Sequence, residues 1–240
     1  MTIIQKPIFN ERVGTPTIIA LPEFNLQFND QRVGPTDFAG LRQADYGQNF
    51  RMPTMPELVR LIYASLENRR DYSSARNVVQ KLREYWLTGN TGILFTQKGM
   101  YVKDNPEMKE GRIVMNEKKL EGKLGKTEVK GVTFSNDLSV RFTPYGFKRE
   151  SQTASKLAKN SGVIAIAGGE EEAEIIAKSS EHYETNPYFR AFNEDSPQTK
   201  VAVLSSFIFA DRLDVYAADE ELDGGGCSFG VRELKAGEAK

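Results

Sequence analysis

The residue types that most often carry catalysis are scarce in this chain. It holds one histidine, His182, and one cysteine, Cys227. These counts exclude an intrachain disulfide, a zinc site with several cysteines and a metal site built on a pair of histidines. His182 lies within residues 180–184 with no nucleophile motif beside it, so we expect a surface or hydrogen-bonded structural role rather than catalysis.

Carboxylates are abundant, but no pair stands out by its spacing or apolar setting as an acid–base couple. Asp219, Glu220, Glu221 and Asp223 could gather a calcium ion, because a hard cation takes several oxygen ligands from a flexible loop. Their spacing is not that of an EF-hand. We therefore expect a solvated acidic loop, and neither a metal nor a cofactor.

Gly168-Gly169 precedes a run of glutamates and raises the question of phosphate binding. The dinucleotide-binding and P-loop fingerprints are both absent. The carboxylates of residues 170–172 would repel a phosphate, whereas they interact favourably with the dipole of a helix that begins there. The sequence therefore predicts a turn between a strand and a helix.

Residues 205–223 mix large aromatic, small and acidic side chains, with no helical or strand period after Phe209. Aromatic groups on such a segment are either buried or available to a partner, for which they offer contact area at little entropic cost. From these residues alone, an ordinary strand and loop is the simpler interpretation.

Length and charge exclude several broad classes. The chain has 240 residues, with 32 Lys and Arg against 33 Asp and Glu, a formal net charge of −1. This fits a single domain with a core of its own, and it gives no support for a nucleic-acid partner. No apolar run approaches the roughly 18–20 residues of a membrane span, and the first residues lack the apolar region of a signal peptide. We therefore expect no membrane insertion and, by default, a cytoplasmic location.

Two amphipathic helices are predicted early in the chain. Thr54 and Glu57 have the spacing of a capping box, and apolar residues at helical intervals follow it as far as Leu66. A second helix is predicted from residues 73–74 to near Gly89, with Trp86 on its apolar face. Residues expected in the core include Leu58, Leu61, Val79, Leu82, Val201, Val203 and Val231.

The remaining segments are predicted to be mostly short strands between turns. Residues 118–130 are strongly charged and are predicted to form an exposed loop or short helix, and Ser151 or Thr153 is expected to cap a short helix with Leu157. Residues 163–166 are apolar throughout, which predicts a strand covered on both sides. The predicted strands are 24–28, 93–95, 100–102, 112–115, 132–134, 140–142, 201–209 and 229–232.

Two segments together resemble a known family. Phe50-Arg51-Met52-Pro53-Thr54-Met55-Pro56-Glu57-Leu58 resembles the start of the first helix in C-type lectin-fold domains of the formylglycine-generating-enzyme type. Gly225-Gly226-Cys227-Ser228-Phe229-Gly230-Val231-Arg232 resembles their closing strand. The resemblance implies an α+β, C-type lectin-like fold over residues 1–240, with an insert at roughly 90–190. Two early helices, short antiparallel strands and a closing C-terminal strand would make up the domain.

This resemblance also implies a function. The family's oxidase needs a pair of cysteines for copper, and Cys227 stands alone here, so that activity is not supported. The variable proteins of diversity-generating retroelements, in particular archaeal ones, instead display a hypervariable segment just before the last strand. The resemblance therefore implies a non-enzymatic binding protein whose ligand, expected to be a protein, contacts region 200–232. The residues expected to contact it are Phe207, Phe209, Asp211, Asp214, Tyr216 and Asp219.

Two other functions are left open by the sequence. The first is a metal-dependent hydrolase or transferase that uses Asp211, Asp214 and Asp219. The second is a structural subunit of a viral or surface assembly. The oligomeric state and the ligand are not predicted.

Overall fold

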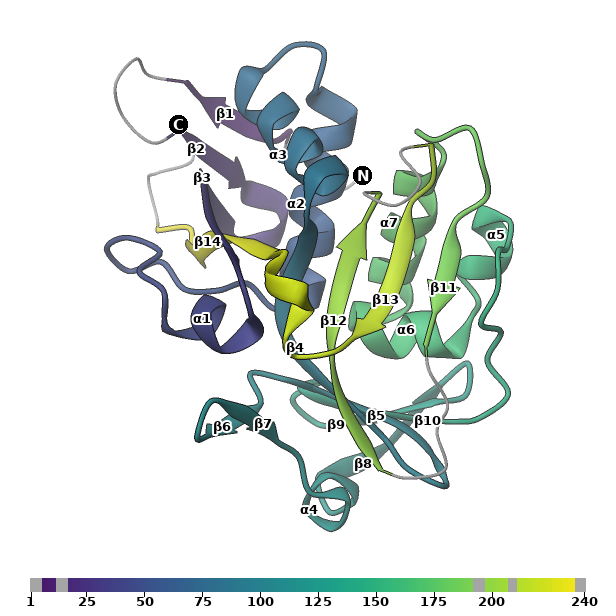
Figure 1. Ribbon diagram of the computed structural model, residues 1–240. Helices are drawn as coiled ribbons and strands as arrows, with labels where there is room; N and C mark the ends of the chain where they lie inside the picture. Colours follow the sequence, from purple (N-terminus) through teal and green to yellow (C-terminus); the bar gives the residue numbers. More distant parts are fainter. Residues whose placement is uncertain (1–5, 12–16, 192–196, 207–210, 236–240) are drawn as a thin grey trace.

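The computed structural model describes residues 6–11, 17–191, 197–206 and 211–235. Over these residues the chain is an α+β protein in which a branched, mostly antiparallel sheet is packed against helices (Figure 1). The helices are α1 (Phe38–Gln43), α2 (Met55–Asn68), α3 (Ser73–Glu84), α4 (Glu117–Glu121), α5 (Ala154–Leu157), α6 (Ser161–Ala167) and α7 (Glu170–Ser180), with 3₁₀ turns η1 (Pro22–Phe24) and η2 (Leu222–Gly224).

The strands alternate with these helices along the chain. They are β1 (Ile8–Asn10), β2 (Ile18–Leu21), β3 (Leu26–Thr36), β4 (Trp86–Phe95), β5 (Gly99–Asp104), β6 (Glu107–Lys109), β7 (Arg112–Val114), β8 (Leu124–Val129), β9 (Val132–Ser135), β10 (Val140–Pro144), β11 (Tyr188–Arg190), β12 (Gln198–Ser205), β13 (Asp214–Ala218) and β14 (Gly226–Glu233).

The sheet branches at β4. One path runs β1-β2-β3-β14-β4-β5-β10-β9-β8, and β12 pairs with β4 on one side and with β13 on the other. The closing strand β14 is thus inserted between the early strand β3, to which it is antiparallel, and the first residues of β4. Strands β6 and β7 form a separate hairpin. The two ends of the described chain therefore belong to the same part of the sheet.

The first predicted helix is confirmed as α2. Glu57 accepts the backbone N–H of Thr54 at 2.7 Å, so the capping box fixes the start of the helix. The second is confirmed as α3, but it ends at Glu84 rather than near Gly89. Trp86 is the first residue of β4 and only half-buried, so its placement in the helical core was wrong.

The predicted strand at 163–166 is wrong, because these residues belong to helix α6. Its apolar residues are fully buried on every side, and a helix that is apolar all round has the same sequence pattern as a buried strand. The helix ends at Gly168, which has a φ of +109° that only glycine adopts without strain, and α7 begins at Glu170 as predicted.

Most of the remaining predicted elements are present with shifted ends. The segment 118–130 holds both the short helix α4 and strand β8, and Thr153 stands at the start of α5. Strand β3 begins at Leu26 and buries side chains on both faces rather than one. The seven residues expected in the core are all buried.

The sheet is covered on both faces where it carries the C-terminal strands. Helices α2, α3, α6 and α7 belong to the largest apolar cluster, and Figure 1 shows α6 and α7 behind β12 and β13. A second cluster on the opposite face is formed by α1, η2 and the β6–β7 hairpin. Within the described residues, no helix has the length and apolar character required to cross a membrane.

Candidate functional site

The two segments that carry the family resemblance contact each other directly. The backbone N–H of Arg51 donates to the carbonyl of Val231 at 2.9 Å, and the Val231 N–H donates back at 2.8 Å. The Arg51 guanidinium forms a fork with Glu57 at 2.8 and 2.6 Å. The start of α2 and the closing strand are therefore held together by a backbone bridge, although they are 180 residues apart (231 − 51).

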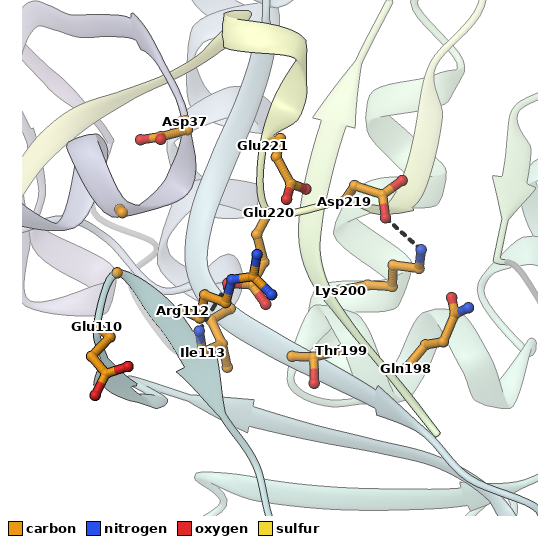
Figure 2. A pocket seen from close by; sticks show the side chains of 12 residues that line it. Asp37, Glu110, Arg112, Ile113, Gln198, Thr199, Lys200, Asp219, Glu220 and Glu221 are labelled. Carbon is orange, nitrogen blue, oxygen red and sulfur yellow. Dashed lines mark hydrogen bonds and ion pairs between the residues drawn. The ribbon is translucent and has the colours of Figure 1, made fainter. Parts of the chain in front are cut away.

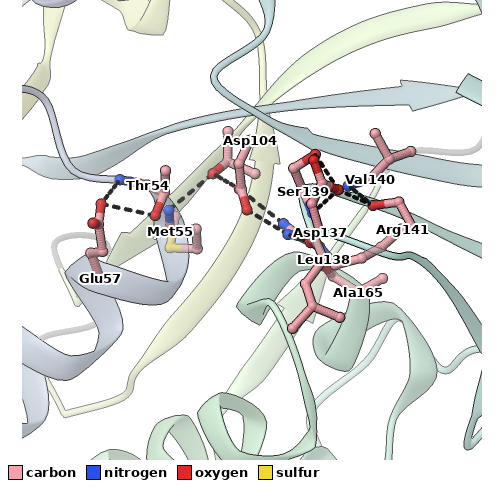
Figure 3. A network of polar contacts seen from close by, with 12 residues as sticks. Thr54, Met55, Glu57, Asp104, Asp137, Leu138, Ser139, Val140, Arg141 and Ala165 are labelled. Atoms are coloured by element: carbon pink, nitrogen blue, oxygen red, sulfur yellow. Dashed lines mark hydrogen bonds and ion pairs between the residues drawn. The ribbon is translucent and has the colours of Figure 1, made fainter. Parts of the chain in front are cut away.

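A buried ion pair joins β5 and β10 beside this point. Arg141 is 1% exposed and donates to both carboxylate oxygens of Asp104, and its Nε donates to the carbonyl of Ala165 in α6 at 2.7 Å (Figure 3). Thr91 of β4 donates to the same aspartate at 2.6 Å and accepts the N–H of Met55, the first residue of α2. This network ties α2 and α6 to strands β4, β5 and β10.

The residues predicted to contact ligand lie in different environments. Phe207 and Phe209 lie outside the described residues. Asp211 and Asp219 are exposed, as expected for ligand contact. Asp214 is 0% exposed and Tyr216 6%, so the expectation that these two side chains project into solvent is wrong.

Asp214 and Tyr216 are buried because they belong to a ladder of charged and aromatic groups along β13 and β11. Arg212 donates to the two oxygens of Asp214 at 2.6 and 3.2 Å, and the Tyr216 hydroxyl donates to it at 3.1 Å. The guanidinium of Arg190 lies 5.1 Å from the ring centroid of Tyr216, and that of Arg212 lies 4.9 Å from the ring of Tyr188. Asp214 thus has a positioning role within the strand pair.

A small cavity adjoins the other side of Tyr216. Its ring stacks with Trp86 at a centroid distance of 6.4 Å, and the two rings with Arg190, Asp219 and Asp223 line a volume of about 180 Å³, which we call the aromatic cavity. The Trp86 indole N–H is buried and has no acceptor within the described part of the chain. Burial raises the pKa of the Tyr216 hydroxyl to about 12, with the Asp214 carboxylate adding to the shift, so the phenol stays a hydrogen-bond donor at neutral pH.

A larger cavity of about 560 Å³ lies beyond Asp219, and we call it the acidic cavity (Figure 2). The Nζ of Lys200, 8% exposed, pairs with Asp219 at 2.6 Å. Asp219 lines both cavities, so this ion pair lies between them. The charged residues that line the acidic cavity are Asp37, Glu110, Arg112, Lys200, Asp219, Glu220 and Glu221.

Glu220 anchors the loop after β13. Its carboxylate accepts the N–H of Ile113 in β7 at 2.8 Å, and its carbonyl accepts the N–H of Phe38 at the start of α1. Burial raises the pKa of Glu220, an effect that the neighbouring Glu221 and Asp219 reinforce. The acidic cavity therefore has a negative potential that favours cationic groups.

The contacts of His182 agree with the hydrogen-bonded structural role predicted for it; no role was predicted for Cys227. The His182 Nε2 lies 2.7 Å from a carboxylate oxygen of Glu67, and its Nδ1 lies 3.1 Å from the Arg69 guanidinium. Cys227 is buried in β14, and burial raises the pKa of its thiol to about 12. Among the residues described, no group of three or more acidic, histidine or cysteine side chains is arranged to hold a metal ion.

Sequence reasoning missed five of the aromatic and charged lining residues: Trp86, Arg190, Arg112, Asp37 and Glu110. Trp86 was assigned to a helix, and the other four come from β11, the β6–β7 hairpin and the start of α1, far from the C-terminal segment in sequence. No local pattern marks them, because strand pairing across the fold is what brings them to the cavities. The described lining residues offer aromatic faces, carboxylates, guanidinium groups and the ammonium of Lys200.

Comparison with known proteins gives no further assignment: no protein-family model, no curated protein and no solved structure matches this chain.

Proposed function

We propose that the protein is a non-enzymatic binding protein with a C-type lectin-like fold, similar to the variable proteins of diversity-generating retroelements. Region 200–232 would contact the ligand, which we expect to be a protein. The observation that carries the proposal is the position of the two cavities. Both are lined in part by residues of the segment between β13 and β14, and both adjoin a frame fixed by backbone pairing.

The contact between Arg51 and Val231 supports the fold part of the proposal. A family resemblance carried by two short segments has more weight when these segments pair, because chance matches at opposite ends of a chain have no reason to meet. The closing strand between β3 and β4 also brings the two ends of the domain together.

The buried positions refine the proposed contact set. Asp211, Tyr216 and Asp219 remain candidates, with Phe207 and Phe209, and Tyr216 would act through the ring edge that lines the aromatic cavity. Trp86 and Arg190 join them as fixed contacts from the frame. Asp214 would not touch a ligand, since its carboxylate is enclosed by Arg212 and Tyr216.

A genomic test addresses the proposal directly. We expect a reverse-transcriptase gene and a near-copy of the end of this gene beside it, differing at adenines. Among sister copies, substitutions should gather at the lining residues that follow β13, Asp219, Glu221 and Asp223, and spare Ala202, Leu204 and Val215, whose side chains are buried in the main core. Lack of the near-copy, or substitutions spread evenly over buried and exposed positions, would remove the retroelement assignment.

A further inference from the structure

A third cavity lies away from the C-terminal segment, between the first described residues, the η1 turn and helix α2. Its volume is about 450 Å³, and we call it the amino-terminal cleft. Three aromatic rings line it, those of Phe24, Tyr63 and Tyr72. Each is partly buried against the main core, and the Tyr72 ring stacks on Phe9 at a centroid distance of 4.4 Å.

Carboxylates surround these rings. Glu23, Glu67 and Asp71 line the same cleft. Within the described part of the chain, the carboxylates of Glu23 and Asp71 have no ion-pair or hydrogen-bond partner, whereas Glu67 contacts His182.

The cations at the cleft do not offset this charge fully. Arg60 is held in an ion pair with Glu172, and Lys6 is exposed at the start of the described chain. Burial, with Glu67, Glu181 and Glu23 adding to it, raises the pKa of the Tyr63 phenol, which is consistent with a negative potential at this ring.

Aromatic faces edged by carboxylates are the environment that an organic cation prefers. A guanidinium stacks on a ring with its flat face and donates in a fork to a carboxylate with its edge. The cleft already contains one such contact, since the Arg60 guanidinium lies 4.3 Å from the ring centroid of Phe24. Tyr63 and Tyr72 present further rings along the same cleft, next to the unpaired Asp71 and Glu23.

We propose that the amino-terminal cleft binds an arginine side chain of a partner protein, with the guanidinium stacked on Tyr63 or Tyr72 and paired with Asp71 or Glu23. The site is separate from the cavities of the C-terminal segment and would be occupied whether or not that segment varies. It would give the protein a fixed docking point alongside its proposed ligand surface.

The test is a titration of the full ¹⁵N-labelled chain with N-acetyl-arginine amide, in which NMR chemical shifts of the backbone amides report binding. N-acetyl-citrulline amide is the matched neutral probe, because it replaces the charged guanidinium by a urea of nearly the same shape. We expect the arginine compound to shift amides of residues 60–72 and to bind about three- to tenfold more tightly than the citrulline compound. Raising the ionic strength from about 0.01 to about 1 M, which shortens the Debye length from about 30 to about 3 Å, should weaken binding.

Two double variants distinguish the effect of the carboxylates at the cleft from the effect of the protein's net charge. Glu23→Gln with Asp71→Asn should weaken arginine binding about three- to tenfold. Glu128→Gln with Glu150→Gln removes the same charge from exposed positions that line none of the three cavities and should change arginine binding less than about twofold. Thermal unfolding of both variants confirms that they fold.

Three results would overturn the inference. One is equal binding of the citrulline compound, and another is equal weakening by the two double variants. The third is a shift of the same amides on raising the protein concentration alone, which would mean that a second copy of the chain covers the cleft.

Discussion

Replacing Asp214 by alanine tests whether the C-terminal segment is anchored as its contacts indicate. The carboxylate is 0% exposed and accepts two bonds from Arg212, at 2.6 and 3.2 Å, and one from the Tyr216 hydroxyl at 3.1 Å. Its removal takes the Tyr216 hydroxyl's acceptor and the Asp214 contacts of the Arg212 guanidinium away at a buried position.

The expected cost follows from that geometry. Breaking a buried ion pair by removing one partner costs about 3–5 kcal/mol, because the remaining charge is uncompensated. The Arg212 side chain retains 15% exposure, which allows some hydration, so we expect the lower end of this range, about 3 kcal/mol. At this chain length each kcal/mol moves Tm by about 2–4 °C, which gives a decrease of roughly 6–12 °C.

Equilibrium unfolding in urea, with Tm as a second readout, measures this cost. Glu121→Ala is the control: this carboxylate also forms an ion pair, with Lys98, but the two side chains are 53% and 59% exposed, so its loss should cost about 0–1 kcal/mol. Arg212→Met combined with Asp214→Leu should recover much of the stability, since the buried ion pair is replaced by apolar side chains. Equal destabilisation by the Asp214 and Glu121 variants, or a double variant less stable than Asp214→Ala, would refute the reasoning.

Three further predictions concern single residues. Gly168→Ala should destabilise the protein by more than about 1 kcal/mol, because φ is +109° and the new Cβ would lie 2.3 Å from the Pro56 ring. Gly111→Ala is the control: its φ is +78° but the space around it is open, so it should cost only the backbone strain. Chemical unfolding compares the two variants. Glu220→Gln should stabilise the protein at neutral pH and leave stability nearly unchanged below pH 4. Burial raises the pKa of Glu220 in the folded state, so its protonated carboxyl contributes to wild-type stability at low pH, and this contribution is lost as the pH rises above about 4.5. Unfolding curves of both proteins from pH 3 to 8 would show this difference or contradict it. Cys227 should resist a thiol reagent at pH 8 until the protein unfolds, since burial raises its pKa to about 12; rapid labelling of the native chain would mean that β14 opens locally.

The sequence predicted those elements whose local signals agree with their packing. Helix α2 has a capping box at its start, an apolar stripe along its length and no competing signal, and the structure confirms it. At Gly168 the turn and the start of α7 at Glu170 were predicted, but the element before the turn is helix α6 and not the predicted strand.

Sequence reasoning failed where burial removes the periodicity on which it depends. In α6, buried on every side, the apolar run carries no 3.6-residue pattern, so a strand and a helix could not be separated. In β13, Asp214 and Tyr216 are buried although the resemblance implied ligand contact. Tyr216 stacks with Trp86 of β4 and lies beside Arg190 of β11, partners that tertiary pairing sets and local sequence does not show. The partners of Asp214 are only two residues away, Arg212 and Tyr216, but nothing in their spacing shows that the strand is buried.

The burial of β13 limits what the proposed variable segment could change. All five of its residues are buried, Val215 and Ala217 in the core beneath the helices and Tyr216 and Ala218 in the core on the opposite face. A substitution in the strand would therefore disturb one of the two cores. It would also disturb the hydrogen bonds that Asp214 accepts from Arg212 and Tyr216. Residues before and after the strand are not so constrained, since Asp211 and Asp219 are exposed. If the segment does vary, the positions free to change are those that flank β13, and the strand itself keeps these flanks at a fixed separation over the frame.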